Sequence, residues 1–370
     1  MYLRYRRLLC VVLTYLAVVG PAVAQQDSVR AGKPEKVKKR DNPAPKPLFA
    51  TTDVLSFTLN ARFQPILRRA TTQAATAEPQ YPALLSTATD AGETGTFPVN
   101  LRVRGNFRRA SDNCTFPPLY LLLPRMPNTP FARQKKLKLV THCNDEQYVL
   151  KEYLIYQVFN CLTDLSFGAR LAQITYADSA KKGAANAFTR WGILLEDDND
   201  LADRNRAVLY KDRYRAEHCD TLTMATVAMF EYMIGNTDWS VPFRHNIRLV
   251  TDSSHARPMP VPYDFDHSGL VEAPYAKPAE QLNLTTVRER LYRGPIYPRS
   301  VLTQTISRFN RAKTALYALY EGETRLNRAY IRQSVTYLDE FYRLLNDPEA
   351  VVRVFQDPTG RGVQIKGLNR

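Results

Sequence analysis

The chain has 370 residues, of which 44% are hydrophobic and 11% aromatic, and its formal net charge is +15. This composition can supply a hydrophobic core, so it excludes a chain that is disordered throughout. The positive charge favours acidic partners, but the cations are scattered, and no basic helix or zinc-finger spacing indicates nucleic-acid binding. We therefore expect a folded, monomeric protein that does not bind nucleic acid.

Residues 1–24 are predicted to form a cleavable secretory signal. Three arginines precede the apolar run Leu8–Val19, and a tripeptide of small residues ending at Ala24 follows it. At about 1.5 Å per residue this run is too short to span about 30 Å of hydrocarbon as a helix, which disfavours the alternative of a permanent anchor. We expect cleavage after Ala24, no membrane span in the mature chain, and an exported protein in the periplasm or outside the cell.

The next segment, residues 25–48, is predicted to be a disordered linker because it is charged and contains few large apolar residues. Alternating apolar residues or short apolar runs then predict a first, β-rich region. The strands are expected in residues 53–63, 97–109, 117–123 and 135–140.

The cysteines agree with export. After loss of the signal an even set remains, Cys114, Cys143, Cys161 and Cys219, which allows three pairings. Cys114 and Cys143 flank a predicted pair of strands, so we expect a disulfide between them, worth about 3 kcal/mol or somewhat more. Cys161, on the apolar face of a predicted helix, and Cys219 could instead be buried thiols.

Beyond residue 145 the apolar period changes to three or four residues, which predicts an amphipathic helix over 149–162. Further strands are expected in 169–178, 190–198 and 208–212, and further helices in 222–234, 300–320 and 330–345. Strands first and helices later, without an alternating βαβ pattern, indicate an α+β fold of two lobes. The predicted boundaries are an N-lobe at 49–212, a C-lobe at 213–345 and a C-terminal tail at 346–370.

The segment 235–270 is the most informative for chemistry. It contains two predicted strands that would form a hairpin and bring Asp238 and Asn246 towards Asp264 and Asp266. Carboxylate and amide oxygens are the ligands that Mg²⁺ prefers, and a carboxylate kept free of the metal can take a proton from a hydroxyl. Each acid alone is also an ordinary capping or turn residue. Their convergence nevertheless predicts a metal or catalytic site.

Four motifs resemble those of the CotH-like (spore coat protein H) family of atypical secreted kinases, which is related in fold to HipA-type and Golgi secretory kinases. They are LRVRGNFRR (101–109), RWGILLEDD (190–198), VLYKD (208–212) and PYDFDHSG (262–269). The resemblance covers roughly residues 50–345. It implies a two-lobed protein-kinase-like fold, with a β-rich N-lobe and a mainly helical C-lobe. It also implies transfer of phosphate from ATP, with Mg²⁺, to a hydroxyl of a protein or small molecule.

The resemblance assigns roles to the acids of the 235–270 segment. Asp264 would be the principal magnesium ligand, with Asn246 and Asp266 as further metal-binding candidates. Asp238 would be the catalytic residue that accepts the proton of the acceptor hydroxyl. The aromatic residue before the acidic pair is Tyr263, where the family has Trp.

The resemblance also points to residues that would hold the nucleotide. Glu152, on the first amphipathic helix, would steady a phosphate-binding lysine. That lysine is Lys138 as first candidate and Lys211 as second. Arg104 and Glu196 lie within two of the matching motifs and are further nucleotide-binding candidates.

Three other functions stay open. The first is a metal-dependent hydrolase that uses His245, Asp264, Asp266 and His267, although no HExxH spacing is present. The second is a catalytically inactive envelope or surface scaffold whose positive charge binds polyanions, and the scarcity of ATP outside the cytoplasm favours it. The third is a kinase-like protein that binds nucleotide without turnover.

Overall fold

The computed structural model describes residues 46–69, 79–181 and 186–356. The predicted signal, most of the predicted linker and residues 357–370 of the predicted tail lie outside these ranges. Within the described ranges, no helix combines the length and the apolar composition needed to cross a bilayer.

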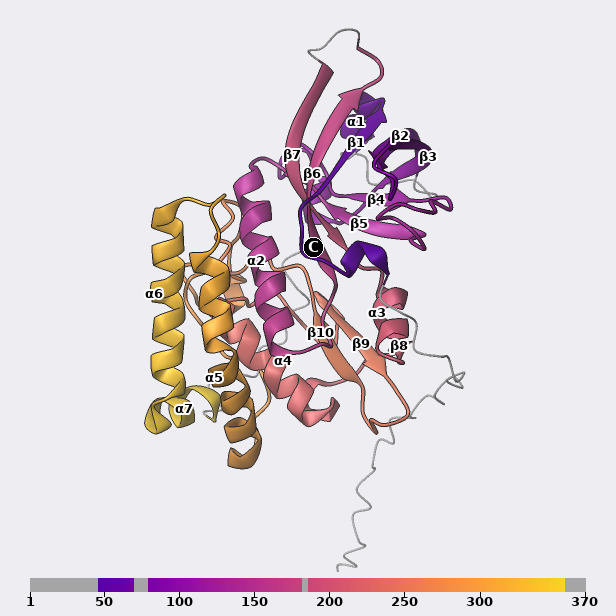
Figure 1. Cartoon of the computed structure of the whole chain (residues 1–370). Helices are drawn as coiled ribbons and strands as arrows, with labels where there is room; N and C mark the ends of the chain where they lie inside the picture. Colours follow the sequence, from indigo (N-terminus) through magenta and orange to yellow (C-terminus); the bar gives the residue numbers. More distant parts are fainter. Residues whose placement is uncertain (1–45, 70–78, 182–185, 357–370) are drawn as a thin grey trace, which may run out of the picture. The chain divides into compact units, whose positions relative to one another are not determined.

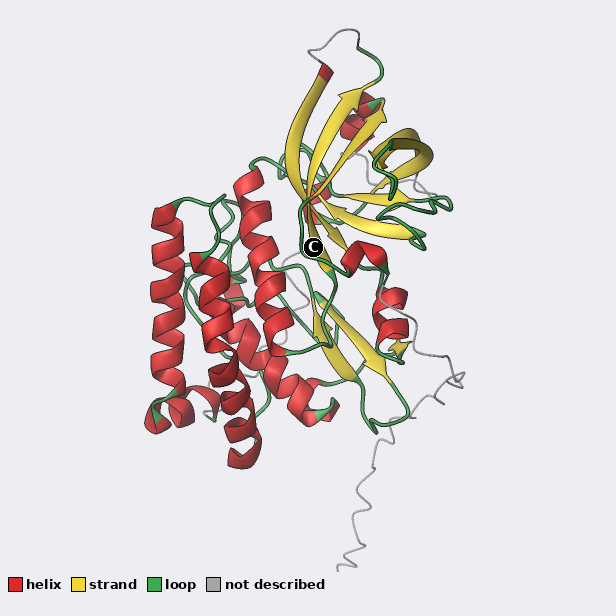
Figure 2. Cartoon of the chain, viewed as in Figure 1, coloured by secondary structure: helices red, strands yellow, loops and turns green. Residues whose placement is uncertain are grey.

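Seven strands close into a mixed β-barrel in the order β1-β2-β3-β4-β5-β7-β6 (Figures 1 and 2). Neighbouring strands are antiparallel except for β1 and β6, which run parallel from the pair Leu55 and Ala172 to the pair Ala61 and Asp178. The strands are β1 (Leu55–Ala61), β2 (Tyr81–Ala88), β3 (Thr94–Val103), β4 (Leu119–Leu122), β5 (Lys136–Val140), β6 (Ala169–Asp178) and β7 (Ala187–Leu195).

This closed barrel contradicts the predicted two-lobed, protein-kinase-like fold. The predicted N-lobe contains strands that follow one another in the sequence and form a β-rich lobe. In the structure, β1 pairs with the distant strand β6, and the sheet closes on itself. Apolar alternation indicates which side chains face a core, but it does not specify which distant strands become neighbours. The kinase-like motifs therefore do not imply the kinase fold for this chain.

The barrel core explains why the strands form where they do. Alternate apolar residues point inward, and Leu101, Leu119 and Leu137 on three adjacent strands are fully buried. Because side chains alternate along a strand, the residue next to each of these leucines points to the outer face of the barrel. There Arg102, Tyr120 and Lys138 stand opposite one another in the strand register.

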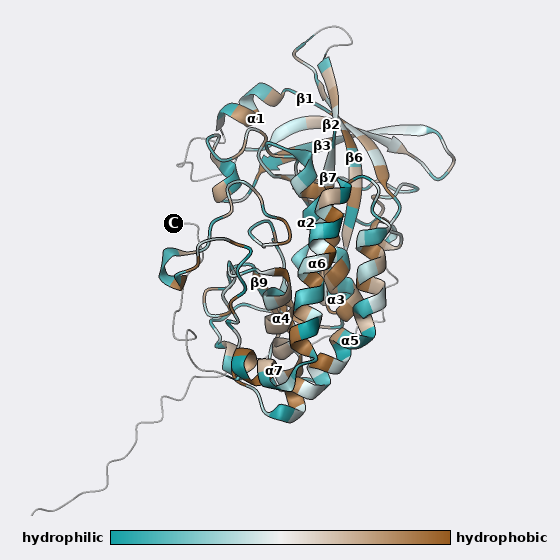
Figure 3. Ribbon diagram, turned by 90° about the vertical axis from the view of Figure 1, so that its left-hand side faces the viewer, coloured by the Kyte–Doolittle hydropathy of each residue, from teal (hydrophilic) through white to brown (hydrophobic). Residues whose placement is uncertain are grey.

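The remaining chain forms helices and a second, three-stranded sheet of order β10-β9-β8. Helix α2 packs against β6 and β7 and also against α5, while α4 packs against α5 and β10. Figure 3 shows both hydrophobic and hydrophilic stretches along α5 and α6, as expected for helices that are half exposed. The helices are α1 (Phe63–Arg69), α2 (Glu146–Leu162), α3 (Asp198–Arg204), α4 (Thr221–Ile234), α5 (Arg299–Glu321), α6 (Arg328–Leu345) and α7 (Pro348–Phe355), and the strands are β8 (Val208–Tyr210), β9 (Ile247–Thr251) and β10 (Met259–Pro262).

The predicted order of helix, loop and hairpin in the 222–269 segment is confirmed. Helix α4 ends at Gly235, which has the left-handed φ of +69° that favours glycine. Strands β9 and β10 then pair antiparallel, and the N–H of Tyr263 donates to the carbonyl of Asn246 at 3.0 Å. The hairpin thus places Asn246 beside the residue that precedes Asp264.

The predicted disulfide between Cys114 and Cys143 is also confirmed, with the two Cα atoms 4.9 Å apart. It links the loop after β3 to the segment that leads into α2. Of the other two cysteines, Cys219 is a buried free thiol, whereas Cys161 is free and exposed.

Candidate functional site

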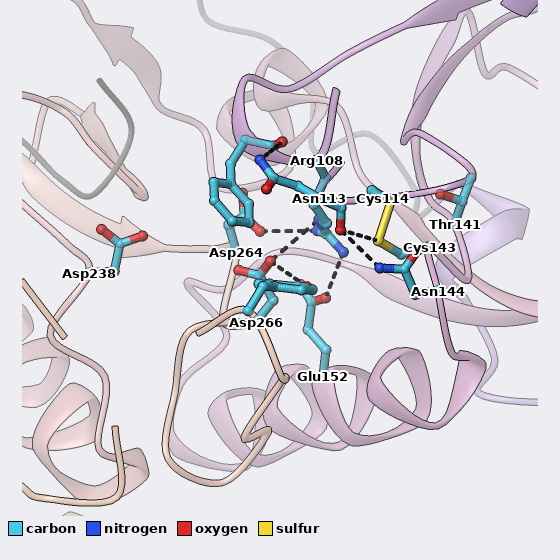
Figure 4. Close-up of polar contacts among 12 residues, drawn as sticks. Arg108, Asn113, Cys114, Thr141, Cys143, Asn144, Glu152, Asp238, Asp264 and Asp266 are labelled. Carbon is cyan, nitrogen blue, oxygen red and sulfur yellow. Dashed lines mark hydrogen bonds and ion pairs between the residues drawn. A yellow bond between two sulfur atoms is a disulfide. The ribbon is translucent and has the colours of Figure 1, made fainter. Parts of the chain in front are cut away.

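Arg108 lies at the centre of a group of acids (Figure 4). Its guanidinium nitrogens lie 3.3 Å from Asp264 Oδ1, 3.3 Å from Asp266 Oδ2 and 3.7 Å from Glu152 Oε2. We call these four residues the Arg108 cluster. Three of their side chains are buried, and only that of Asp264 keeps a substantial exposed fraction, 32%. Asp264 is therefore the carboxylate of the cluster that is most accessible from solvent.

Distant parts of the chain build the Arg108 cluster. Arg108 follows β3 in a short 3₁₀ turn, three residues after Gly105, which has a left-handed φ of +80°. Glu152 projects from α2, and Asp264 and Asp266 follow β10. The cluster thus ties the barrel, a helix and the second sheet together.

Two of the carboxylates that share this guanidinium, Glu152 and Asp266, have pKa values shifted in opposite directions. Burial raises the pKa of Glu152 to about 8, although the nearby Arg108 opposes this shift. For Asp266, burial is outweighed by Arg108 and His267, which lower its pKa, and by the hydroxyl of Tyr275, which donates to Oδ2 at 2.9 Å. Burial therefore favours the neutral form of Glu152, whereas Asp266 is held in its ionised form.

The backbone at Asp264 is held in an unusual conformation. Its φ is +67°, in the left-handed region that residues other than glycine rarely adopt. Its N–H donates to the hydroxyl of Tyr156 at 2.9 Å. Such conformations persist where the surroundings fix them, and they are concentrated at functional sites.

Asp238 forms a second group with His245 and Asn246. Its Oδ1 lies 2.9 Å from His245 Nε2, and Asn246 Nδ2 donates to its Oδ2 at 3.2 Å and to its backbone carbonyl at 2.8 Å. The side chain of Asp238 is only 3% exposed, whereas that of His245 is 18% exposed. Burial lowers the pKa of His245, but the Asp238 carboxylate outweighs burial and raises it. Figure 4 shows Asp238 apart from the Arg108 cluster.

Lys138 lies in a third group, on the outer face of the barrel. Its ammonium pairs with Asp198, whose other oxygen accepts from Arg248 Nε at 2.8 Å. The ammonium also lies 4.9 Å from the ring centroid of Phe167 and 5.1 Å from that of Tyr263. Burial lowers the pKa of Lys138 to about 8, and its two cationic partners lower the pKa of Asp198 to about 2.

Further cations extend this group across the barrel surface. The charged groups of Arg102, Arg104 and Lys136 lie 4.8, 5.6 and 5.5 Å from the ring centroid of Tyr120. Arg104 is also close enough to Lys138 to lower the pKa of that lysine. We define the basic face by its five cations, which are Arg102, Arg104, Lys136, Lys138 and Arg248.

Tyr263 connects the basic face to the Arg108 cluster. The guanidinium of Arg248 lies 4.4 Å from the centroid of its ring, and Lys138 contacts the same ring. The next residue is Asp264. Cations suited to an anionic ligand and a reachable carboxylate suited to a metal ion are therefore neighbours.

Two predicted site residues lie outside these groups, and one has a different partner from the one expected. Glu196 is buried, pairs with Arg204 at 3.0 Å and accepts from the N–H of Gly168, which ties it to the local fold. Lys211 is exposed, just beyond β8. Glu152 contacts Arg108, whereas Lys138 contacts Asp198.

Sequence reasoning missed several residues that the fold brings to the site. Arg108 lies within the motif at 101–109, but nothing in the sequence distinguishes it from the neighbouring arginines. The sequence predicts Asp198 at the end of a strand. In the structure it is the first residue of α3, directly after the N-cap residue Asp197. The three aspartates and one asparagine at 197–200 are typical of a helix start and could have revealed α3. Arg248 had no detectable signal, because its role depends on the β8-β9-β10 sheet.

The described residues contain no group of three or more His, Cys, Asp or Glu side chains placed to hold a metal ion. This observation is compatible with magnesium binding, because Mg²⁺ is usually bound through one or two carboxylates together with water and substrate phosphates. In the Arg108 cluster the guanidinium contacts one oxygen of Asp264 and one of Asp266. The donor set therefore fits a metal ion that arrives with a phosphate ligand, not one held by the protein alone.

Comparison with known proteins gives no direct lead to function. The chain matches no model of a known protein family and no curated protein. Its function must therefore be argued from the geometry of the site.

Proposed function

We propose that the protein binds a nucleoside triphosphate, such as ATP, with Mg²⁺ and transfers its terminal phosphoryl group to a hydroxyl. The observation that carries this proposal is the contact of Lys138 and Arg248 with Tyr263, directly before the partly exposed carboxylate of Asp264. A polyphosphate requires cations for its oxygens and a carboxylate for its metal ion. The proposal rests on this site and not on a kinase fold.

The basic face would hold the phosphates. Lys138 and Arg248 are kept in position by Asp198, so they are oriented before a ligand arrives. A bound phosphate would favour the charged form of Lys138, whose pKa is lowered to about 8 by burial. Catalysis of phosphoryl transfer depends mainly on such positioning and charge neutralisation.

Asp264 would bind the magnesium ion together with phosphate oxygens. The bound ion would neutralise negative charge that develops on the phosphates during transfer. Asp266 is 8% exposed and bonded to Arg108 and Tyr275, so its contribution is to orient Arg108 and the loop. Asn246 donates to Asp238 and would support that acid.

The acceptor hydroxyl would lose its proton to the pair of Asp238 and His245. Asp238 is nearly inaccessible, so the imidazole is the member that a hydroxyl meets first. Its Nε2 faces Asp238, which leaves Nδ1 to take the proton. As the oxygen–phosphorus bond forms, the bond to the leaving diphosphate breaks, and the proton stays on the imidazole next to Asp238.

The first test is a titration with ATP, with and without Mg²⁺, followed by thermal shift or calorimetry. We expect magnesium-dependent binding by the wild type, and Asp264→Ala should abolish that dependence because it removes the reachable carboxylate. Asp90→Ala, which removes an exposed acid beyond β2, is the matched control and should bind like the wild type. Absence of magnesium-dependent binding in folded wild type would reject the proposal, and binding of inorganic polyphosphate alone would favour a polyanion-binding scaffold.

A further inference from the structure

A cavity of about 320 Å³ lies beside the Arg108 cluster. It is formed by the loop that carries the disulfide, the first turns of α2 and the segment around Tyr275. Arg108 and Glu152 line it, whereas none of the five cations of the basic face, all of them described residues, does so. Its volume is at the lower end of the range for small-molecule sites. The cavity is therefore separate from the place proposed for the phosphates.

One wall of this cavity carries a hydrogen-bonding atom without a partner. Glu152 is 1% exposed, and its Oε1 has no hydrogen-bond partner within the part of the chain that the structure describes. In Figure 4 its side chain extends from α2 towards Arg108. A buried polar atom left unpaired costs about 1–3 kcal/mol, so such an atom on a cavity wall indicates a missing ligand group.

The charges around the cavity indicate what that group is. Asp112 and Asp145 line it together with Glu152, and Arg108 is the one cation among the residues that line it in the described chain. Asp264 and Asp266 already share this guanidinium. Carboxyl groups are thus in excess, and a cationic ligand group is favoured over an anionic one.

The other walls fit a small organic cation. Tyr148 and Tyr275 offer aromatic rings, whose faces attract cations. The amides of Asn113 and Asn144 and the hydroxyl of Thr141 can hydrogen-bond polar groups of a ligand. We propose that the cavity binds a small primary amine, with its ammonium group donating to Glu152 Oε1. This proposal stands independently of nucleotide binding.

The test is calorimetric titration with glucosamine and with putrescine, in the absence of nucleotide and magnesium. We expect saturable binding of at least one of these amines. N-acetylglucosamine and diacetylputrescine, which lack the charge, should bind at least tenfold more weakly. Because no nucleotide is present, failure here leaves the phosphoryl-transfer proposal untouched, and the converse holds as well.

Variants locate the binding in the cavity. Glu152→Gln keeps the shape of the side chain but removes the carboxyl group that can ionise beside a bound ammonium, and it should weaken amine binding at least tenfold. Glu217→Gln removes an exposed acid outside the cavity and should have no effect. Should Glu152→Gln fail to fold, Tyr148→Ala, at a half-buried position on the wall, should weaken binding several-fold. The proposal is overturned if neither amine binds, if the acetylated compounds bind equally well, or if a folded Glu152→Gln or Tyr148→Ala protein binds as the wild type does.

Discussion

In the proposed reaction, the contact between Asp238 and His245 determines which group takes the proton of the acceptor hydroxyl. Asp238 is bonded by His245 on one oxygen and by Asn246 on the other, so both of its oxygens are engaged. The carboxylate raises the pKa of the imidazole. His245 must be neutral to accept a proton, and phosphoryl transfer should therefore increase as pH rises through this raised pKa.

Asp238→Asn tests this arrangement. Nucleotide binding should survive, because the proposal assigns the phosphates to Lys138 and Arg248 and the metal ion to Asp264, while turnover should fall about 10²-fold or more. Without the carboxylate the pKa of His245 should decrease, so the rise in rate should move to lower pH. A pH profile of turnover for the two proteins measures both effects. An unchanged profile would show that His245 is not the group that titrates.

Among the elements, the most consequential link is the disulfide between the Arg108 loop and the start of α2. It joins residues 29 apart in the sequence. Replacing both Cys114 and Cys143 by Ser should lower the free energy of unfolding by about 3 kcal/mol, because the unfolded chain regains the freedom of that loop. Guanidinium unfolding measures this loss. Cys161→Ser, at an exposed free thiol, is the control and should change stability little.

The end of α4 fixes the start of the loop that carries Asp238. Gly235 has φ of +69°, and a Cβ there would meet the hydroxyl of Tyr337 and lie 3.1 Å from the carbonyl oxygen of Val287. Gly92 has φ of +82° with nothing within 4 Å. Gly92→Ala should therefore cost only about 1–2 kcal/mol of unfolding free energy, for the backbone conformation. Gly235→Ala should cost clearly more, and equal losses in chemical denaturation would contradict the proposed close packing.

At the scale of the whole molecule, the packing of helices against one another and against the second sheet buries an acid that would otherwise be solvated. Glu231 on α4 accepts from Asn236 at 2.9 Å, yet burial raises its pKa from 4.5 to about 8. Between these two values the folded state holds a proton that the unfolded state has lost. The free energy of unfolding should therefore decrease as pH rises through this window.

Glu231→Gln removes this titration while keeping the side-chain shape. The slope of unfolding free energy against pH, between about pH 5 and 8, should become less negative by up to about 1.4 kcal/mol per pH unit. Urea unfolding across this range measures the slope. Glu340→Gln, at an exposed acid on α6, should leave it unchanged. A slope that is the same in wild type and Glu231→Gln would show that this acid is ionised in the fold.

The sequence alone determined the local elements and the groups of residues they carry. Apolar alternation and period located most strands and helices, the cysteine positions indicated the disulfide, and the polar residues around the β9–β10 hairpin identified the acids at Asp238 and Asp264. It missed β2, α1 and α3, and it placed α7 within a tail. These patterns work because they depend on neighbours within one strand or helix.

Only the tertiary structure decided how these pieces meet. The parallel contact of β1 with β6 closes the barrel and replaces the expected two-lobed fold. The placing of Arg108 among three carboxylates, and of Lys138 beside Asp198 and Tyr263, depends on residues far apart in the sequence, and Arg108 and Asp264 are 156 positions apart. Such contacts are set by packing of whole elements and by the pairing of buried charges, which a local pattern does not encode.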